Sequence, residues 1–236
     1  MRLLVLNPNS TASMTAKIGT AARAAASPGT EVLAQDPGVG PVSIEGYVDE
    51  AYAVPGMLDV IRRADRDGVD AHIIACFDDT GLDAARALAD APAIGIGEAA
   101  FHMASLVAGK FSVVTTLSRS IPAIEHNLVR YGLSSRCARV RASEVPVLAL
   151  EDPASDAAAR IADEIERAKA EDRAEAIVLG CAGMADLAAR LSKAHGLPVL
   201  DGVTCAVKLA ESLVALGLRT SKRGGYARPL AKDYKR

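Results

Sequence analysis

Short apolar runs alternate with alanine-rich amphipathic stretches along nearly the whole chain of 236 residues. The expected strands are residues 3–6, 31–34, 71–75, 93–96, 111–115, 139–143, 176–179 and 198–200. Most are continuous runs rich in Val and Ile, which is typical of parallel strands covered on both faces. The expected helices are residues 11–25, 50–67, 82–89, 98–107, 121–131, 155–171, 184–195 and 204–216. This alternation predicts an α/β fold in which helices wrap parallel sheets.

The second half of the chain repeats features of the first half. Residues 72–76 and 176–181 each form an apolar run that ends in a cysteine, Cys76 and Cys181 respectively. We therefore expect two similar αβα lobes related by a pseudo-symmetric duplication. The first is residues 1–100, completed by the C-terminal helix and tail (203–236), and the second is residues 101–202. Ligands of open α/β sheets bind outside the carboxyl ends of strands, so the active site is expected in the cleft between the lobes.

Charge and composition argue against nucleic acid and membranes as partners. The formal net charge is −2 and aromatic residues make up 3% of the chain, which disfavours nucleic acid and anionic membranes. Its apolar amino terminus is too short for a signal peptide, so a cytoplasmic protein is expected. Residues 219–236 hold seven basic residues and one acidic residue, and we expect this tail to dock on the acidic body or on a neighbouring subunit. The alanine-rich helices and the tail together favour a homo-oligomer.

The four cysteines show neither a CxxC pair nor a nearby histidine cluster, so free thiols and no metal are expected. Cys137 and Cys205 are interpreted as small buried apolar residues. Cys76 and Cys181 differ because each stands at a strand end before a helix, whose positive end would lower the thiol pKa from about 8.5. At Cys76 the Asp78 and Asp79 carboxylates would oppose this lowering if they point inward; the alternative is that they cap the helix or hold hydrogen-bond donors. A matched pair facing one small molecule could remove a proton from one face of a carbon and return it to the other.

Other polar and glycine-containing segments also fall at strand ends. Asn7-Pro8-Asn9-Ser10 allows either a turn with Ser10 or Thr11 as helix N-cap, or contacts to a polar ligand. Gly95-Ile96-Gly97-Glu98 matches a relaxed dinucleotide fingerprint, but no acidic residue follows about twenty residues later. These glycines are therefore expected to permit close strand–helix packing, and no cofactor is expected. The four histidines have no triad spacing, which disfavours hydrolysis.

On these motifs the chain resembles the aspartate/glutamate/hydantoin racemase superfamily from end to end, and most closely its hydantoin and allantoin branches. The resemblance is carried by residues 7–11, 76–81, 95–98, 113–116, 180–184 and 201–203. It implies two lobes, two cysteine acid/bases and no cofactor. We expect contacts to a small-molecule substrate from Asn7, Pro8, Asn9, Ser10, Pro41, Ile44, Phe77, Asp78, Asp79, Thr115, Thr116, Gly180, Ala182 and Gly183.

Departures from related branches narrow the expected reaction. Amino-acid racemases follow their two cysteines with Asn-Thr and Thr-His, whereas this chain has Phe77-Asp78 and Ala182-Gly183. Free aspartate or glutamate is therefore disfavoured. The retained pair of cysteines disfavours arylmalonate decarboxylation, which needs one. The predicted function is cofactor-independent racemisation of 5-substituted hydantoins. Allantoin racemisation and maleate isomerisation remain alternatives, as do a non-enzymatic two-lobed binding protein and a redox dithiol protein.

Overall fold

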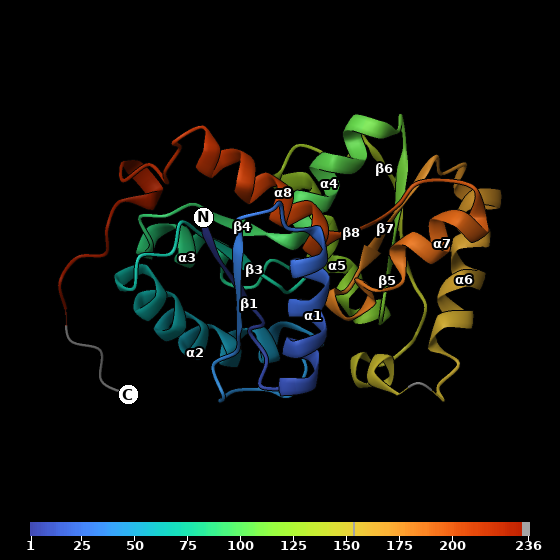
Figure 1. Ribbon diagram of the computed structural model, residues 1–236. Coiled ribbons are helices and arrows are strands. Elements are labelled where there is room, and N and C mark those ends of the chain that lie inside the picture. Colours follow the sequence, from blue (N-terminus) through green and yellow to red (C-terminus); the bar gives the residue numbers. More distant parts are fainter. Residues whose placement is uncertain (153, 233–236) are drawn as a thin grey trace.

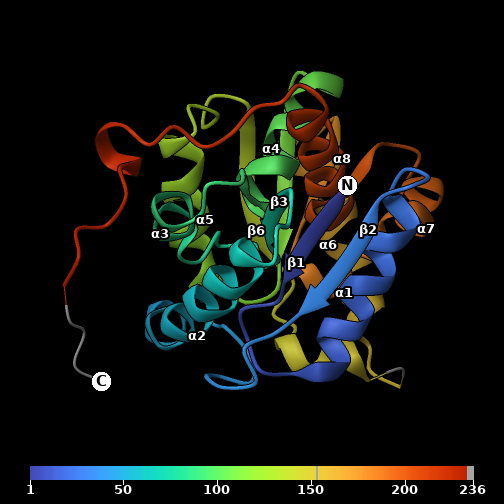
Figure 2. The same ribbon diagram turned by 60° about the vertical axis from the view of Figure 1, so that its left-hand side comes forward.

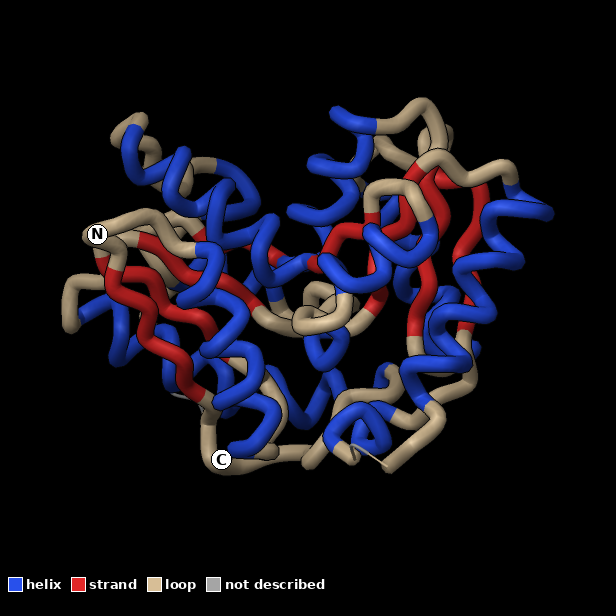
Figure 3. Tube along the Cα trace, turned by 45° about the vertical axis from the view of Figure 1, so that its right-hand side comes forward, coloured by secondary structure: helices blue, strands red, loops and turns tan. Residues whose placement is uncertain are grey.

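The computed structural model describes residues 1–152 and 154–232 and contains two parallel four-stranded sheets (Figures 1 and 3). The first sheet has the order β2-β1-β3-β4, from β1 (Arg2–Leu6), β2 (Glu31–Gln35), β3 (Ala71–Ile74) and β4 (Ala93–Gly95). The second has the corresponding order β6-β5-β7-β8, from β5 (Phe111–Thr115), β6 (Cys137–Ala142), β7 (Ala176–Gly180) and β8 (Val199–Asp201). The predicted α/β fold with two similar lobes is therefore confirmed.

The helices follow the predicted alternation with strands. They are α1 (Ala12–Ala25), α2 (Tyr47–Arg66), α3 (Leu82–Leu88), α4 (Ile96–Val107), α5 (Ile121–Arg130), α6 (Ala157–Arg167), α7 (Ala188–His195) and α8 (Gly202–Ala215). Two differ clearly from prediction. The helix expected over 155–171 ends as α-helix at Arg167 and continues as one π-helical turn, Ala168–Asp172. The helix expected from residue 184 begins at Ala188, because a short 3₁₀ turn, Ala182–Met184, precedes it.

Two helices cross between the lobes. Helix α4 begins directly after β4 of the first sheet but packs on β7 and β8 of the second. Conversely, α8 begins after β8 and packs on β3, β4 and α1 of the first lobe. Figures 1 and 2 both show α4 and α8 next to each other between the sheets. The boundary predicted at residue 100 lies inside α4, which is an element shared by both lobes.

One continuous apolar core joins the two lobes. Its buried members come from both sheets and from both crossing helices, and they include Leu3, Phe101, Phe111, Val178 and Ala206. The Phe101 ring lies 5.9 Å from the Phe111 ring, measured between centroids, and stacks on it. Because a packed core is close to crystalline density, it holds the two sheets, and therefore the strand ends above them, in a fixed relation.

The basic tail docks on the body of the same chain, beside α3. Lys222 Nζ donates to the carbonyl of Arg86 at 2.6 Å, and the Tyr226 hydroxyl donates to Asp83 at 2.9 Å. The tail was predicted to dock on the acidic body or on a neighbouring subunit, and the structure shows it docked on the body. Residues 233–236 of the predicted tail lie outside the described residues. None of the described helices combines the length and the apolar character needed to cross a membrane.

Candidate active site

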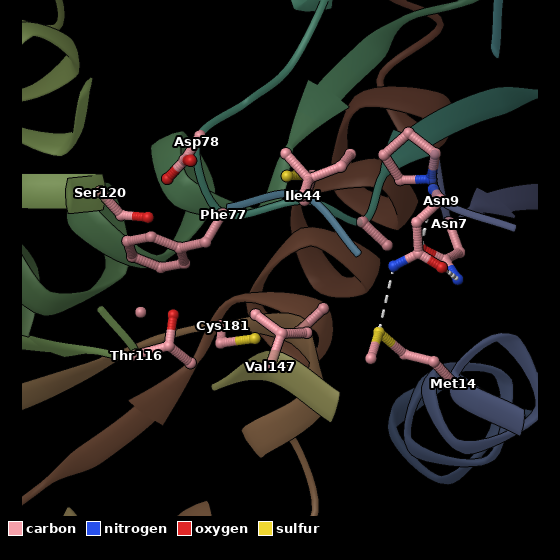
Figure 4. Close-up of a pocket in the computed structure, with 15 residues that line it drawn as sticks. Asn7, Asn9, Met14, Ile44, Phe77, Asp78, Thr116, Ser120, Val147 and Cys181 are labelled. Atoms are coloured by element: carbon pink, nitrogen blue, oxygen red, sulfur yellow. Dashed lines mark hydrogen bonds between the residues drawn. The ribbon is translucent and has the colours of Figure 1, made fainter. Parts of the chain in front are cut away.

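The segments that follow strands of both lobes line a cavity between them (Figure 4). Both predicted acid/base residues, Cys76 after β3 and Cys181 after β7, are in its wall. The complete lining is Asn7, Pro8, Asn9, Met14, Ile44, Ala75, Cys76, Phe77, Asp78, Thr116, Ser120, Val147, Gly180, Cys181 and Ala182. Most of the predicted substrate contacts are therefore brought together. Met14, Ala75, Ser120 and Val147 were not among the predicted residues.

Five predicted contacts lie outside this lining and have other neighbours. The amide of Ser10 donates to the carbonyl of Pro41 at 2.9 Å, which ties the first turn to the loop before α2. Thr115 donates its hydroxyl to the carbonyl of Gly180 at 3.0 Å, joining β5 to β7 below the cavity. A Cβ on Gly183 would lie 3.7 Å from Cys181 Sγ. The fifth residue is Asp79, described below. Substrate contact by these five stays a prediction.

The two asparagines of the first turn organise the start of α1. Thr11 is the N-cap residue, but its hydroxyl donates to Val42 O at 2.6 Å and does not cap the helix. The expectation that Ser10 or Thr11 is the N-cap is therefore confirmed for Thr11, although no side chain caps the helix. The Asn9 side chain instead accepts the amide of Thr11 itself at 2.9 Å. Asn9 Nδ2 donates to Met14 Sδ at 3.2 Å, a weak acceptor, so this donor remains suited to a ligand carbonyl.

Burial has a larger effect on the pKa values of the two cavity thiols than the helix that follows each of them. Desolvation together with the nearby Asp78 carboxylate raises the pKa of Cys76 well above its usual range, although the Thr80 hydroxyl donates to its sulfur at 3.3 Å. Burial raises the pKa of Cys181 to about 11. The predicted lowering is wrong because α3 begins only at Leu82, well past Cys76, and a 3₁₀ turn follows Cys181. Both groups are therefore thiols in the free protein at neutral pH.

Asp79 anchors the loop that carries Cys76. Its backbone has a φ of 52°, and its carboxylate accepts the amides of Gly97 and Glu98 at 2.9 and 2.8 Å. The Tyr131 hydroxyl, from the other lobe, donates to the same carboxylate at 2.7 Å. A Cβ on Gly97 would lie 2.4 Å from the Phe77 carbonyl oxygen, so glycine permits this close approach. The glycines of the relaxed fingerprint thus serve packing, as expected.

Asp78 differs from its neighbour because it lines the cavity, whereas Asp79 does not (Figure 4). Burial and the nearby Glu50 carboxylate raise the pKa of Asp78 to about 7. Its backbone carbonyl accepts Asn127 Nδ2 at 2.9 Å, which fixes the loop against α5 of the second lobe. Among residues 1–152 and 154–232, no group of three His, Cys, Asp or Glu side chains is arranged to hold a metal ion.

Comparisons with known proteins place this geometry in context. The model of the Asp/Glu/Hydantoin racemase family matches residues 3–210. A hydantoin racemase from Rhizobium meliloti is 53% identical over 232 residues, which are 98% of this chain and 96% of the relative. The structure of allantoin racemase from Klebsiella pneumoniae has a TM-score of 0.98 and 51% identity, covering 100% of this chain and 96% of that one. A maleate isomerase from Pseudomonas putida S16 shares the fold, with a TM-score of 0.65, 18% identity, and coverage of 92% and 93%.

Proposed function

The chain belongs to the Asp/Glu/hydantoin racemase family, and from this we propose that it racemises 5-substituted hydantoins, of which allantoin is one. The observation that carries the proposal is the placement of Cys76 and Cys181. They follow corresponding strands of the two lobes and line one cavity from opposite halves of the molecule. A carbon held between two such thiols can exchange its hydrogen from either face.

The proposed reaction is a proton transfer in each direction at C5 of the ring. One cysteine, as thiolate, removes the C5 proton, and the electron pair moves onto the adjacent carbonyl oxygen to form an enolate. The other cysteine, as thiol, returns a proton to the opposite face, and the roles reverse for the other enantiomer. The pair therefore acts with one proton between its two sulfurs. The raised thiol pKa values make each thiolate a stronger base, at the cost of its abundance.

The oxygen that gains charge needs a hydrogen-bond donor. Asn9 Nδ2 lines the cavity and donates to a weak acceptor, the thioether of Met14. Transfer of this donor to the enolate oxygen would stabilise the intermediate where its charge develops. The role of Asn9 in binding the ring, and that of the other predicted contacts, belongs to this proposal.

Replacement of each cavity cysteine tests the two-base reaction. Cys76→Ser and Cys181→Ser should each lower the racemisation rate by about 10²–10⁴, because inversion needs both faces. Exchange without inversion needs one face only. Each variant should therefore still exchange the C5 proton of one enantiomer with deuterium from the solvent, and the two variants should favour opposite enantiomers. NMR of each pure enantiomer in D₂O measures this exchange, after correction for the spontaneous rate.

The matched controls are Cys137→Ser and Cys205→Ser, which replace thiols outside the cavity lining. They should racemise at the unchanged rate. A cavity variant that racemises as fast as the unmodified protein would show that its cysteine is not an essential base. Exchange of the same enantiomer by both cavity variants would instead indicate a one-base reaction.

The alternatives are separated by substrate. Maleate carries two carboxylates, and none of the residues that line the cavity is positively charged. We therefore expect no isomerisation of maleate. A binding protein or a redox dithiol protein would leave the optical rotation of an enantiopure hydantoin unchanged.

A second expectation concerns metal dependence. Since the proposed steps use only thiols and hydrogen-bond donors of the chain, racemisation should survive exhaustive EDTA treatment. Polarimetry before and after chelation measures this. Activity that disappears and returns on adding a divalent metal would contradict the proposed chemistry.

A further inference from the structure

Three polar side chains in the cavity wall have no hydrogen-bond partner among residues 1–152 and 154–232. The hydroxyls of Thr116 and Ser120 are in residues only 4% and 5% exposed, and neither hydroxyl forms a hydrogen bond with another described residue. The Asp78 carboxylate likewise accepts no hydrogen bond and pairs with no cation among the described residues. Figure 4 shows these three on one side of Cys181, and Asn7, Asn9 and Met14 on the other. We call the first side, formed by Asp78, Thr116 and Ser120, the acidic end.

The polar atoms of these three side chains open onto the cavity, so water or a bound molecule there must supply their hydrogen-bond partners. The opposite side of the cavity differs. There, Asn7 Nδ2 donates to Asn9 Oδ1 at 2.8 Å and to Thr15 Oγ1 at 3.0 Å. The acidic end lacks such internal bonds while facing the same cavity. Its free acceptors are therefore suited to hydrogen-bond donors of a bound molecule.

The charged groups near the acidic end are negative. Glu50, from α2, lies close enough to Asp78 to raise its pKa, and Asp79 adds to the effect. Arg119 is next to Ser120 in the sequence, but its side chain lies against Gly46 and outside the cavity lining. A carboxylate bound at this end would meet like charge with no compensating cation in the lining. A neutral group with N–H donors would instead supply the missing partners.

The reaction itself orients the substrate relative to this end. Proton removal from C5 places negative charge on the adjacent ring carbonyl oxygen, and a nearby carboxylate would oppose that charge. The carbonyl is therefore better placed toward Asn9, whose amide group can donate. With the carbonyl at that side and C5 between the cysteines, the group attached to C5 extends toward the acidic end.

We propose that the acidic end is the subsite for the C5 substituent, that it accepts neutral substituents bearing N–H donors, and that it rejects substituents bearing a carboxylate. Asp78 and Ser120 are its specificity-determining residues, and Thr116 completes it. This inference rests on the proposed hydantoin racemisation. It adds the chemical class of the substituent and the residues that select it.

Three hydantoins of nearly equal shape test the subsite. Their C5 substituents are carbamoylmethyl, which is neutral and donates N–H groups; carboxymethyl, which is anionic; and isobutyl, which is apolar. The measurement is kcat/KM for racemisation of each by polarimetry. The unmodified protein should prefer the carbamoylmethyl compound to both others and should use the carboxymethyl compound least.

Asp78→Asn should lower the ratio of kcat/KM for the carbamoylmethyl to the carboxymethyl compound by about tenfold or more, because it removes the facing like charge. A ratio is the decisive quantity, since a changed thiol pKa in Cys76 would affect both substrates equally. The control is Glu125→Gln, which removes the same charge from an exposed position on α5 and should leave the ratio unchanged. Ser120→Ala should lower the preference for carbamoylmethyl over isobutyl by about threefold or more.

The outcomes separate the subsite from the reaction. If the unmodified protein racemises none of the three compounds or any other hydantoin, the proposed function fails. If it racemises them but Asp78→Asn leaves the carbamoylmethyl to carboxymethyl ratio unchanged, the subsite is refuted and the racemase reaction stands. A uniform loss with all three substrates also refutes it, because Asp78 would then contact the ring.

Discussion

The cavity thiols, Cys76 and Cys181, have pKa values raised by burial, and this determines how they should react as a function of pH. Only the thiolate is a nucleophile or a base. A raised pKa means that the thiolate fraction at neutral pH is small and grows as the pH rises toward the pKa. Bound substrate would cover both sulfurs at once, since they share one cavity.

Alkylation measures this directly. The rate of iodoacetamide labelling of Cys181 should rise about tenfold per pH unit from about pH 7 to about pH 10, with no plateau below the pKa of about 11. Mass spectrometry of peptides containing each cysteine gives the rates, with a bound hydantoin expected to protect the two cavity cysteines. A plateau near neutral pH would show that the thiol is activated and would contradict the dominance of burial.

Residues at strand ends could be predicted from sequence because parallel strands bring their carboxyl ends to one edge of a sheet. This explains Asn7, Cys76, Thr116 and Cys181. Ser120 could not be predicted in this way, because it lies in a 3₁₀ turn and meets the cavity only through the packing of the second lobe.

Met14 and Val147 could not be predicted as cavity residues for related reasons. Met14 lies on the apolar face of α1 and reads as an ordinary core residue. Val147 begins a 3₁₀ helix, Val147–Glu151, a few residues after β6, and its amide donates to Glu45 of the first lobe at 2.9 Å. The thiol pKa values also needed the structure, because desolvation depends on which atoms surround a group.

At the scale of elements, the starts of the two crossing helices are in direct contact. Gly202 begins α8, and a Cβ at this position would lie 2.4 Å from the carbonyl oxygen of Ile96, where α4 begins. A backbone oxygen cannot move aside as a flexible side chain can. The close approach of the two lobes at this point therefore depends on glycine.

Gly202→Ala should lower the free energy of unfolding by about 1–3 kcal/mol, since overpacking outweighs the better helix propensity of alanine. Urea denaturation followed by circular dichroism measures the loss. Gly225→Ala is the matched control, because a Cβ there meets no atom within 4 Å. Equal stability of the two variants would mean that the α4–α8 junction tolerates a side chain.

The alternation of elements was predictable because apolar runs and amphipathic stretches differ in period. The end of α6 was not, because it depends on a distant residue. Arg141, on β6, donates to Glu164, Glu171 and Asp172, and the last two belong to the π-helical turn. Sequence patterning also places α4 after β4 without revealing that it covers the other lobe's sheet.

At the scale of the whole molecule, apolar side chains gather on one exposed segment. Val39, Val42, Tyr47, Val48 and Tyr52, from the loop before α2 and the start of that helix, are each more than half exposed. Exposed apolar side chains concentrated in one segment are typical of protein–protein contacts. It adds a second reason, beside the alanine-rich helices, to expect a homo-oligomer.

Light scattering tests the assembly. We expect a mass that is a multiple of the 24.4 kDa chain. Tyr52→Glu should shift the mass toward that of one chain, because it places a charge in the proposed contact. Leu230→Glu, at an exposed apolar position in the tail, is the control. A stable single-chain mass for the unmodified protein would contradict the expectation.

The crossing of α4 and α8 also determines which lobe can complete its fold first during translation. The second lobe takes its strands and α4 from one continuous stretch of chain, so it can close soon after β8 leaves the ribosome. The first lobe is begun earlier but needs α8, which is translated near the end of the chain. Until then, the face of β3 and β4 that α8 covers, including Ile73 and Ile94, stays open on the nascent chain. The half that emerges first is thus the half that is finished last.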